Sequence, residues 1–111
     1  MSTFRIIFLL LLINAFQAIG QEDSVVVKVL VVDDRYGDPI KNAIGVVVSS
    51  DTLFGTTNSK GFFTKRVAVP TNVNVKIAHS QFLSDEQTKK LTTRYAGDTI
   101  VINFKLEFIK S

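Results

Sequence analysis

The chain has 111 residues, of which 46% are hydrophobic; it carries a formal net charge of +3 and contains no cysteine. This length is that of one domain, and the lack of cysteine excludes a disulfide-stapled fold and a lipoprotein anchor on an N-terminal cysteine. The weak, evenly spread positive charge argues against nucleic acid as a partner, because Lys89, Lys90 and Arg94 form only a small cluster of the kind found on solvated faces.

Residues 1–20 have the layout of a secretory signal peptide. The segment contains a single charged residue, residues 6–13 form an unbroken apolar run, and Ala18–Gly20 supplies small residues at the expected cleavage site. The apolar run is shorter than the ~20 residues that cross a bilayer. We therefore expect cleavage before Gln21 and a mature domain of residues 21–111 with no transmembrane anchor. An uncleaved anchor and a buried first helix are the alternatives.

The chain also lacks an Asn-x-Ser/Thr sequon for N-glycosylation. A secreted chain with neither disulfides nor glycan sites fits a bacterial periplasm or exterior, so we expect a secreted or periplasmic protein. Without disulfides, the stability of a domain of this size must come from its apolar core.

Residues 24–33 predict the first strand, with one face directed to the core because side chains alternate along a strand. The core face is formed by Val25, Val27, Val29 and Val31. The opposite face is also apolar and carries Val26, Leu30 and Val32 beside Lys28. Either neighbouring loops cover these side chains or a partner binds to them. Scattered apolar residues are normal on surfaces, so the first explanation is favoured.

Turn residues separate the next strands. Gly37-Asp38-Pro39 ends the first strand, because proline has no N–H group for a β-ladder. Residues 44–48 and 53–57 predict two further strands, and a tight reversal at residues 58–61 precedes a fourth. Lys65 interrupts the alternation of that fourth strand, which indicates a β-bulge or an edge position.

A fifth strand is predicted where polar residues alternate with Val73, Val75 and Ile77. Residues 79–96 give no clear periodicity; we expect a loop or a turn of helix over 85–91 and a short strand over 91–95. Residues 100–108 alternate again and predict the last strand, with Phe104 facing the core. The spacing of strands and turns therefore predicts an all-β fold, a Greek-key β-sandwich of about seven antiparallel strands.

The turns and the apolar positions together match a family motif. After the first Val-rich strand, the chain reads Asp-x-x-x-Gly-x-Pro-Ile-x-Asn-Ala and then Gly-Thr-Thr-Asn-x-x-Gly-x-Phe. This resembles the carboxypeptidase regulatory-like domain, and the residues that carry the match are Asp33, Gly37, Pro39, Ile40, Ala43, Thr57, Gly61, Phe63 and Phe82. The resemblance covers about residues 25–108 and implies a transthyretin-like (prealbumin-like) β-sandwich. Asn58, where the family usually has Asp, and Gln81, where it usually has Gly, depart from the pattern.

No set of residues predicts a reaction. His79 is the only histidine, and neither an acid nor a nucleophile is placed beside it in the sequence. Asp33, Asp34 and Asp38 share one corner, but their spacing matches no calcium loop, and Asp is common in turns. We therefore assign no catalytic, cofactor-binding or metal-binding residues and expect a protein that is not an enzyme. Hydroxyisourate hydrolase, which has the same fold, relies on several histidines and a C-terminal Tyr-Arg-Gly-Ser that this chain does not carry.

The resemblance favours a non-catalytic module for protein interaction or scaffolding in the cell envelope, which presents an exposed strand or a rigid loop end to another envelope protein. The alternative is a small-ligand or glycan-binding domain with exposed aromatic residues near Phe54, Phe62 and Tyr95 at one end of the sandwich; a hydrolase is the least expected. The residues predicted for interaction are Val26, Leu30, Val32, Phe54 and Phe62. Lys28 and Lys65 are expected to guard their strands against self-pairing.

Overall fold

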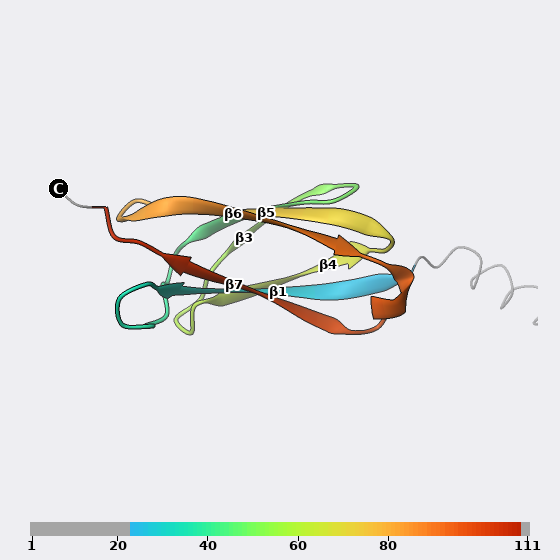
Figure 1. Cartoon of the computed structure of the whole chain (residues 1–111), viewed down its shortest axis with the longest axis horizontal. Coiled ribbons are helices and arrows are strands. Elements are labelled where there is room, and N and C mark those ends of the chain that lie inside the picture. Colours follow the sequence, from blue (N-terminus) through green and yellow to red (C-terminus); the bar gives the residue numbers. More distant parts are fainter. Residues whose placement is uncertain (1–22, 110–111) are drawn as a thin grey trace, which may run out of the picture.

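The computed structural model describes residues 23–109, which form two β-sheets packed face to face (Figure 1). The elements are β1 (Ser24–Asp33), β2 (Ile44–Val48), β3 (Thr52–Thr56), β4 (Phe62–Ala68), β5 (Thr71–His79), β6 (Phe82–Leu91), the 3-10 helix η1 (Thr93–Tyr95) and β7 (Thr99–Leu106). Sheet A has the strand order β4-β1-β7, and sheet B has the order β3-β2-β5-β6. The predicted all-β sandwich is therefore confirmed.

The N-terminal segment that the sequence identifies as a signal peptide, residues 1–20, lies outside the described residues. Within residues 23–109, no helix has the length and apolar character needed to span a membrane.

Alternation of buried and outward-facing side chains along β1, β2, β5 and β7 builds most of the core between the sheets. In β1 every second side chain is buried, and the buried ones are the predicted Val25, Val27, Val29 and Val31. Sheet B contributes Val47 from β2 and the three alternating apolar residues of β5, Val73, Val75 and Ile77. Phe104 of β7 is fully buried, as the alternation of the last strand predicts. Each strand therefore has a second face that points to the outside of the sandwich.

Three features differ from the sequence prediction. Residues 85–91 belong to the ten-residue strand β6 and not to a loop or helical turn, because their main chain pairs with β5. Residues 93–95 form a 3-10 helix where a short strand is predicted. Strand β1 pairs in parallel with β7, whereas the sequence predicts antiparallel pairing throughout.

Phe63 joins the two sheets. It lies on β4 of sheet A, and its buried ring contacts Gly45 and Gly55, which face each other across β2 and β3 of sheet B. A Cβ atom at either glycine would lie 2.3 Å from an atom of the ring. The two strands of sheet B can approach the ring this closely because neither position carries a side chain.

Buried Thr57 ties the segment between β1 and β2 to the end of β3. Its Oγ1 atom donates a hydrogen bond to the carbonyl of Ile40 at 2.6 Å and accepts one from the N–H of Ala43 at 2.8 Å. The main chain of Thr57 is bonded to the same segment, to Asn42 and Ala43. The side chain and the main chain of Thr57 therefore together hold this segment against the end of β3.

Asp33 and Asn58 close the turns at the same end of the sandwich. The Oδ1 atom of Asp33 accepts the N–H groups of Tyr36 and Gly37, and the Oδ1 atom of Asn58 accepts those of Lys60 and Phe62. Because an amide oxygen can accept these bonds as a carboxylate does, Asn58 fills the role of the Asp usual in the resembled family.

Gly61 completes this corner with a φ of +80°. A Cβ atom there would lie 2.6 Å from the main-chain oxygen of Val31, so both the conformation and the space require glycine. The main chain of the segment from Gly37 to Ile40 runs beside the end of β1, where Val32 forms a bridge with Pro39.

Candidate functional site

The predicted interaction residues of β1 lie on the outer face of sheet A. Val26, Leu30 and Val32 are half-buried there, and Phe62 of β4 is the cross-strand partner of Leu30. The Nζ atom of Lys28 lies 4.3 Å from the centre of the Phe62 ring. Neighbouring side chains on the sheet therefore shield part of this face.

The position of β1 corrects the role predicted for Lys28. Because β1 is the central strand of sheet A, its main chain is paired on both sides and Lys28 cannot guard an edge. Lys65 lies on the edge strand β4, whose register with β1 is unbroken. Lys65 therefore takes the predicted edge position without a bulge.

The aromatic residues predicted for the loop end do not gather there. Phe54 lies within β3 and Phe62 within β4, on the outer faces of different sheets. Tyr95 lies in η1 and is partly buried against the core. The prediction of a common Phe54/Phe62 loop end is therefore wrong, because both residues belong to strands and project from opposite sides of the sandwich.

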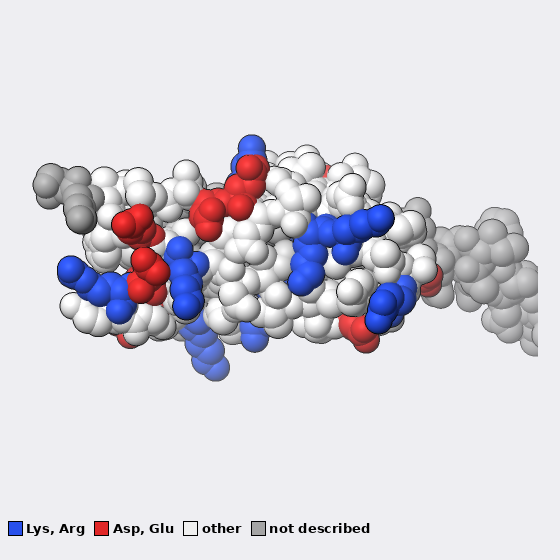
Figure 2. Space-filling view, in the orientation of Figure 1, with Lys and Arg blue, Asp and Glu red and all other residues white. Residues whose placement is uncertain are grey.

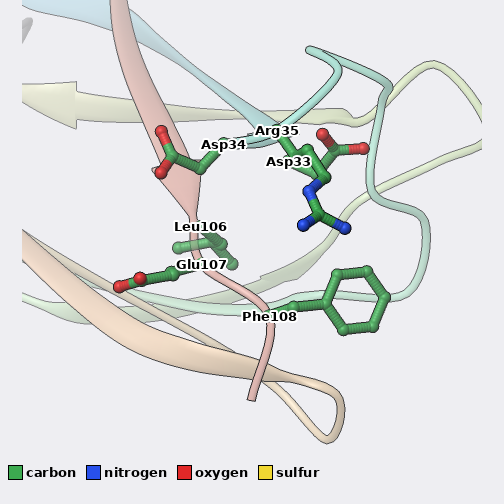
Figure 3. A pocket seen from close by; sticks show the side chains of 6 residues that line it. All are labelled: Asp33, Asp34, Arg35, Leu106, Glu107 and Phe108. Atoms are coloured by element: carbon green, nitrogen blue, oxygen red, sulfur yellow. The ribbon is translucent and has the colours of Figure 1, made fainter. Parts of the chain in front are cut away.

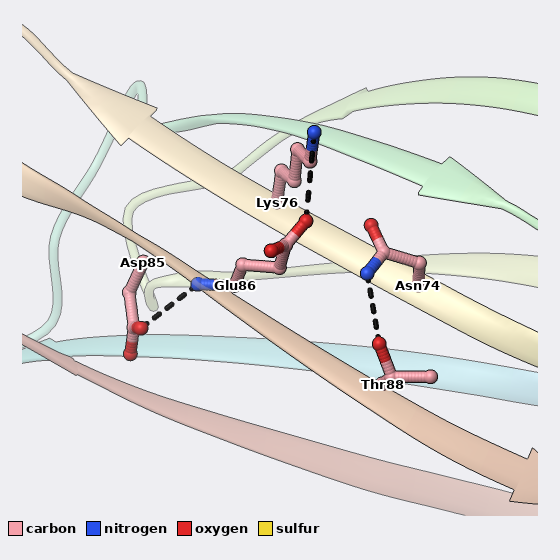
Figure 4. Close-up of polar contacts among 5 residues, drawn as sticks. All are labelled: Asn74, Lys76, Asp85, Glu86 and Thr88. Atoms are coloured by element: carbon pink, nitrogen blue, oxygen red, sulfur yellow. Dashed lines mark hydrogen bonds and ion pairs between the residues drawn. The ribbon is translucent and has the colours of Figure 1, made fainter.

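The outer face of sheet B is divided into a polar half and an apolar half. On β5 and β6, Asn74 Nδ2 donates to Thr88 Oγ1 at 2.9 Å, and Lys76 Nζ lies 3.5 Å from Glu86 Oε2 (Figure 4). These polar pairs satisfy each other along the two strands. This half of the face is therefore a solvated surface.

The other half, on β2 and β3, carries apolar side chains that we call the β2–β3 patch: Ile44, Val46, Val48 and Phe54. Phe54 is 65% exposed and Ile44 57% exposed, while Val46, the cross-strand partner of Phe54, is half-buried between neighbours. The unbroken apolar run of residues 44–48 is a signal for this face in the sequence, but it does not show that the face is open. Ile44 and Val48 are absent from the predicted interaction residues for that reason.

The patch borders the free edge of β3. Thr52–Thr56 pairs only with β2 among the described strands, and it contains neither a charged residue nor a proline. Exposed sheet edges carry unpaired N–H and C=O groups, which proteins usually protect with charges or bulges. Strand β3 has none of these protective residues.

The other three edge strands of the described sheets carry charges. Strand β4 carries Lys65 and Arg66, strand β7 carries Lys105, and strand β6 carries two acidic and two basic residues. Figure 2 shows acidic and basic side chains spread over the β6 and β7 side of the molecule. Strand β3 is therefore the uncharged edge of the sandwich.

Strands β6 and β7 are also linked to each other. Gln87 Nε2 donates to the carbonyl of Asn103 at 2.6 Å, and the N–H of Leu83 donates to the carbonyl of Glu107 at 2.8 Å. These bonds occupy part of the β6 edge and close this side of the sandwich. An approaching strand therefore meets a more open main chain at β3 than at β6.

A hollow of about 410 Å³ lies where β1 and β7 end (Figure 3). It is lined by Asp33, Asp34, Arg35, Leu106, Glu107 and Phe108. The oxygen of Asp33 that closes the turn is already bonded, and the ring of Phe108 packs on Phe82 with 4.4 Å between centroids. The hollow is thus formed largely by groups that hold this corner together.

His79 has a local role in the turn between β5 and β6. Its Nδ1 atom accepts the N–H of Gln81 at 3.1 Å, and its ring meets Phe82 edge to face at 5.3 Å. Within residues 23–109, no three His, Asp or Glu side chains come together in a group that could hold a metal ion.

Comparison with known proteins relates the chain to others by structure. No family model matches the sequence, and no curated protein matches it. The 3-chlorocatechol 1,2-dioxygenase of Rhodococcus opacus 1CP is similar in structure, with a TM-score of 0.64 and 14% identity, over 80% of this chain and 61% of that one.

Two other solved structures are similar to this chain. The minor pilin GBS52 of Streptococcus agalactiae has a TM-score of 0.64 and 10% identity, over 81% of this chain and 47% of that one. The Bacillus anthracis TIE protein has a TM-score of 0.61 and 16% identity, over 78% of this chain and 17% of that one. The chain thus spans less than two thirds of each of these three proteins, and at these identities the likeness establishes the all-β sandwich fold alone.

Proposed function

We propose that this chain is a non-catalytic, secreted or periplasmic β-sandwich module that binds another protein of the cell envelope through the β2–β3 patch and the edge of β3. The observation that carries the proposal is the coincidence of an exposed apolar patch with the uncharged sheet edge. An added strand bonds to the main chain of such an edge, while apolar side chains beside it supply selectivity.

The β2–β3 patch is a stronger candidate for the binding site than the outer face of β1. Phe54 and Ile44 are exposed, whereas Val26, Leu30 and Val32 are only partly accessible and belong to a central strand. A partner can therefore reach side chains and main chain together at β3, but only side chains at β1. The proposed site therefore lies on sheet B and not on sheet A.

The proposed family is the carboxypeptidase regulatory-like group of β-sandwiches. Three residues of the family motif support this proposal, because each has a defined structural role at one corner. Thr57 bonds the carbonyl of Ile40, Gly61 fits a site with no room for a Cβ atom, and Asp33 accepts main-chain N–H groups in its turn. A minor pilin among the similar structures supports a module that acts outside the cytoplasm.

The test is co-purification from an envelope extract with the secreted chain as bait. The variants are Ile44→Lys in the patch and Val101→Lys as the matched control, because Val101 is also a β-branched residue exposed on the outer face of a strand. We expect specific partners to be lost with Ile44→Lys and kept with Val101→Lys. Equal binding by both variants would contradict the proposed site, and turnover of a small substrate by the purified chain would contradict its non-catalytic role.

A second candidate function is the binding of a small ligand in the hollow at the ends of β1 and β7. Phe108 favours it, since its ring lines the hollow and is 56% exposed. A Phe108→Ser variant tests it: ligand binding in the hollow should be lost while partner capture by the β2–β3 patch is retained.

A further inference from the structure

We infer that a second copy of this chain binds the edge of β3, so that two β3 strands pair antiparallel about a two-fold axis at Phe54. The inference rests on the surface named in the proposed function and adds a second occupant of the same edge, which an envelope partner would have to displace. Two-fold dimers use the same patch on both subunits, so the patch must be complementary to itself.

The sequence Thr-Leu-Phe-Gly-Thr of β3 meets that requirement. With the axis at Phe54, the two Phe54 residues face each other on the outer side of the sheet. Thr52 then faces Thr56 of the partner strand, and Leu53 faces Gly55. Paired aromatic residues and paired threonines are favourable cross-strand neighbours, and glycine leaves room for the leucine opposite.

Charge and existing hydrogen bonds disfavour an equivalent pairing at the other edges. Full antiparallel pairing of two β4 strands would place Lys65 opposite Lys65, and like charges directly opposite are destabilising. Strands β6 and β7 are already linked to each other, because Gln87 bonds the carbonyl of Asn103 in β7 and Leu83 bonds that of Glu107 just after it. The pairing of β3 brings no charged residue of the strand against another.

The dimer would join the two four-stranded B sheets into one continuous sheet. The two β2–β3 patches then lie side by side across the axis and form one wider apolar surface. A five-residue strand pair is small compared with the interfaces of stable dimers, so we expect a reversible dimer that is populated as the concentration rises.

The first experiment measures the mass of the secreted chain by sedimentation at rising concentration. We expect wild type and Val101→Lys to shift from monomer to dimer. Phe54→Lys should stay monomeric, because it places two positive charges together at the axis. Because Phe54 is exposed, this variant should fold, which circular dichroism checks.

The second experiment uses the absence of cysteine from the chain. Under mild oxidation, Phe54→Cys should form a covalent dimer, whereas Thr52→Cys and Thr56→Cys should each form no covalent dimer when alone. When the two variants are mixed, a disulfide should form between the cysteine at position 52 of one copy and the cysteine at position 56 of the other. The proposed pairing places residue 52 opposite residue 56. Cross-strand neighbours have the Cα separation that a disulfide needs.

A wild-type chain that stays monomeric at every concentration, with no covalent dimer from Phe54→Cys, overturns the inference. If such a monomer still captures an envelope partner through the β2–β3 patch, the edge is occupied by a strand of that partner and the proposed function stands. A dimer that captures no partner supports the inference and contradicts the proposed function.

Discussion

Replacing Gly55 by alanine should destabilise the domain through Phe63. The added Cβ would lie 2.3 Å from a ring atom, against the 3.4 Å at which ordinary contact begins. The ring cannot move far, because Gly45 contacts it as closely from the neighbouring strand. Overpacking of this kind costs about 1–3 kcal/mol.

The intrinsic preference of the strand acts in the opposite direction. Alanine is favoured over glycine in a strand interior by about 0.5–1 kcal/mol, so the net loss of unfolding free energy should lie between about 0 and 2.5 kcal/mol. For a domain of this size, each kcal/mol lowers the Tm by about 4–8 °C. Thermal and urea unfolding of the Gly55→Ala variant measure the loss.

A double-mutant cycle identifies the ring as the cause. In a Phe63→Leu background, which removes the ring at the cost of a cavity, Gly55→Ala should be neutral or stabilising, with a coupling energy of about 0.5–3 kcal/mol. The reasoning is refuted if Gly55→Ala raises the Tm of the wild type, or costs the same in both backgrounds.

Four further outcomes are expected. Phe104→Ala should cost about 3–5 kcal/mol because it empties a fully buried site, while Asn103→Ala on the exposed face should cost under about 1 kcal/mol; the reverse order in denaturant melts would contradict the register of β7. Thr57→Val should cost about 1–3 kcal/mol by leaving buried main-chain groups unbonded, and unchanged urea unfolding would show that those bonds contribute nothing. Intact-mass measurement of secreted protein should find Gln21 as the first residue, and a species that keeps Met1 would exclude cleavage. In hydrogen exchange, amides of β3 should exchange faster than those of β1 because β3 buries no residue; equal protection would contradict this.

The sequence predicted the strands that have one buried face. Strands β5 and β7 overlap the predicted ranges, because burial of alternate residues imposes a period of two on the sequence. Strand β6 has no such face: its residues from Leu83 to Lys90 are all exposed. It is a strand because its main chain pairs with β5, and that pairing leaves no period in the side chains.

The candidate site was predicted only in part. Phe54 is among the predicted interaction residues, but it was grouped with Phe62, which lies on the other sheet. The sequence records which side chains share a face of one strand, but it does not record whether that strand is central or at an edge. The order of the strands in each sheet decides which strand has a free edge: β1 is central and β3 lies at an edge.

The core and the proposed binding surface meet at β3. Gly55 leaves space for Phe63 and Leu53 is only partly buried, so β3 contributes no fully buried side chain to the core, and among the described strands it pairs only with β2. A second strand that pairs with the folded form stabilises it. The glycine that admits the ring of Phe63 therefore also leaves β3 dependent on pairing. This dependence is the physical reason to expect that the free edge of β3 is where the domain binds another strand.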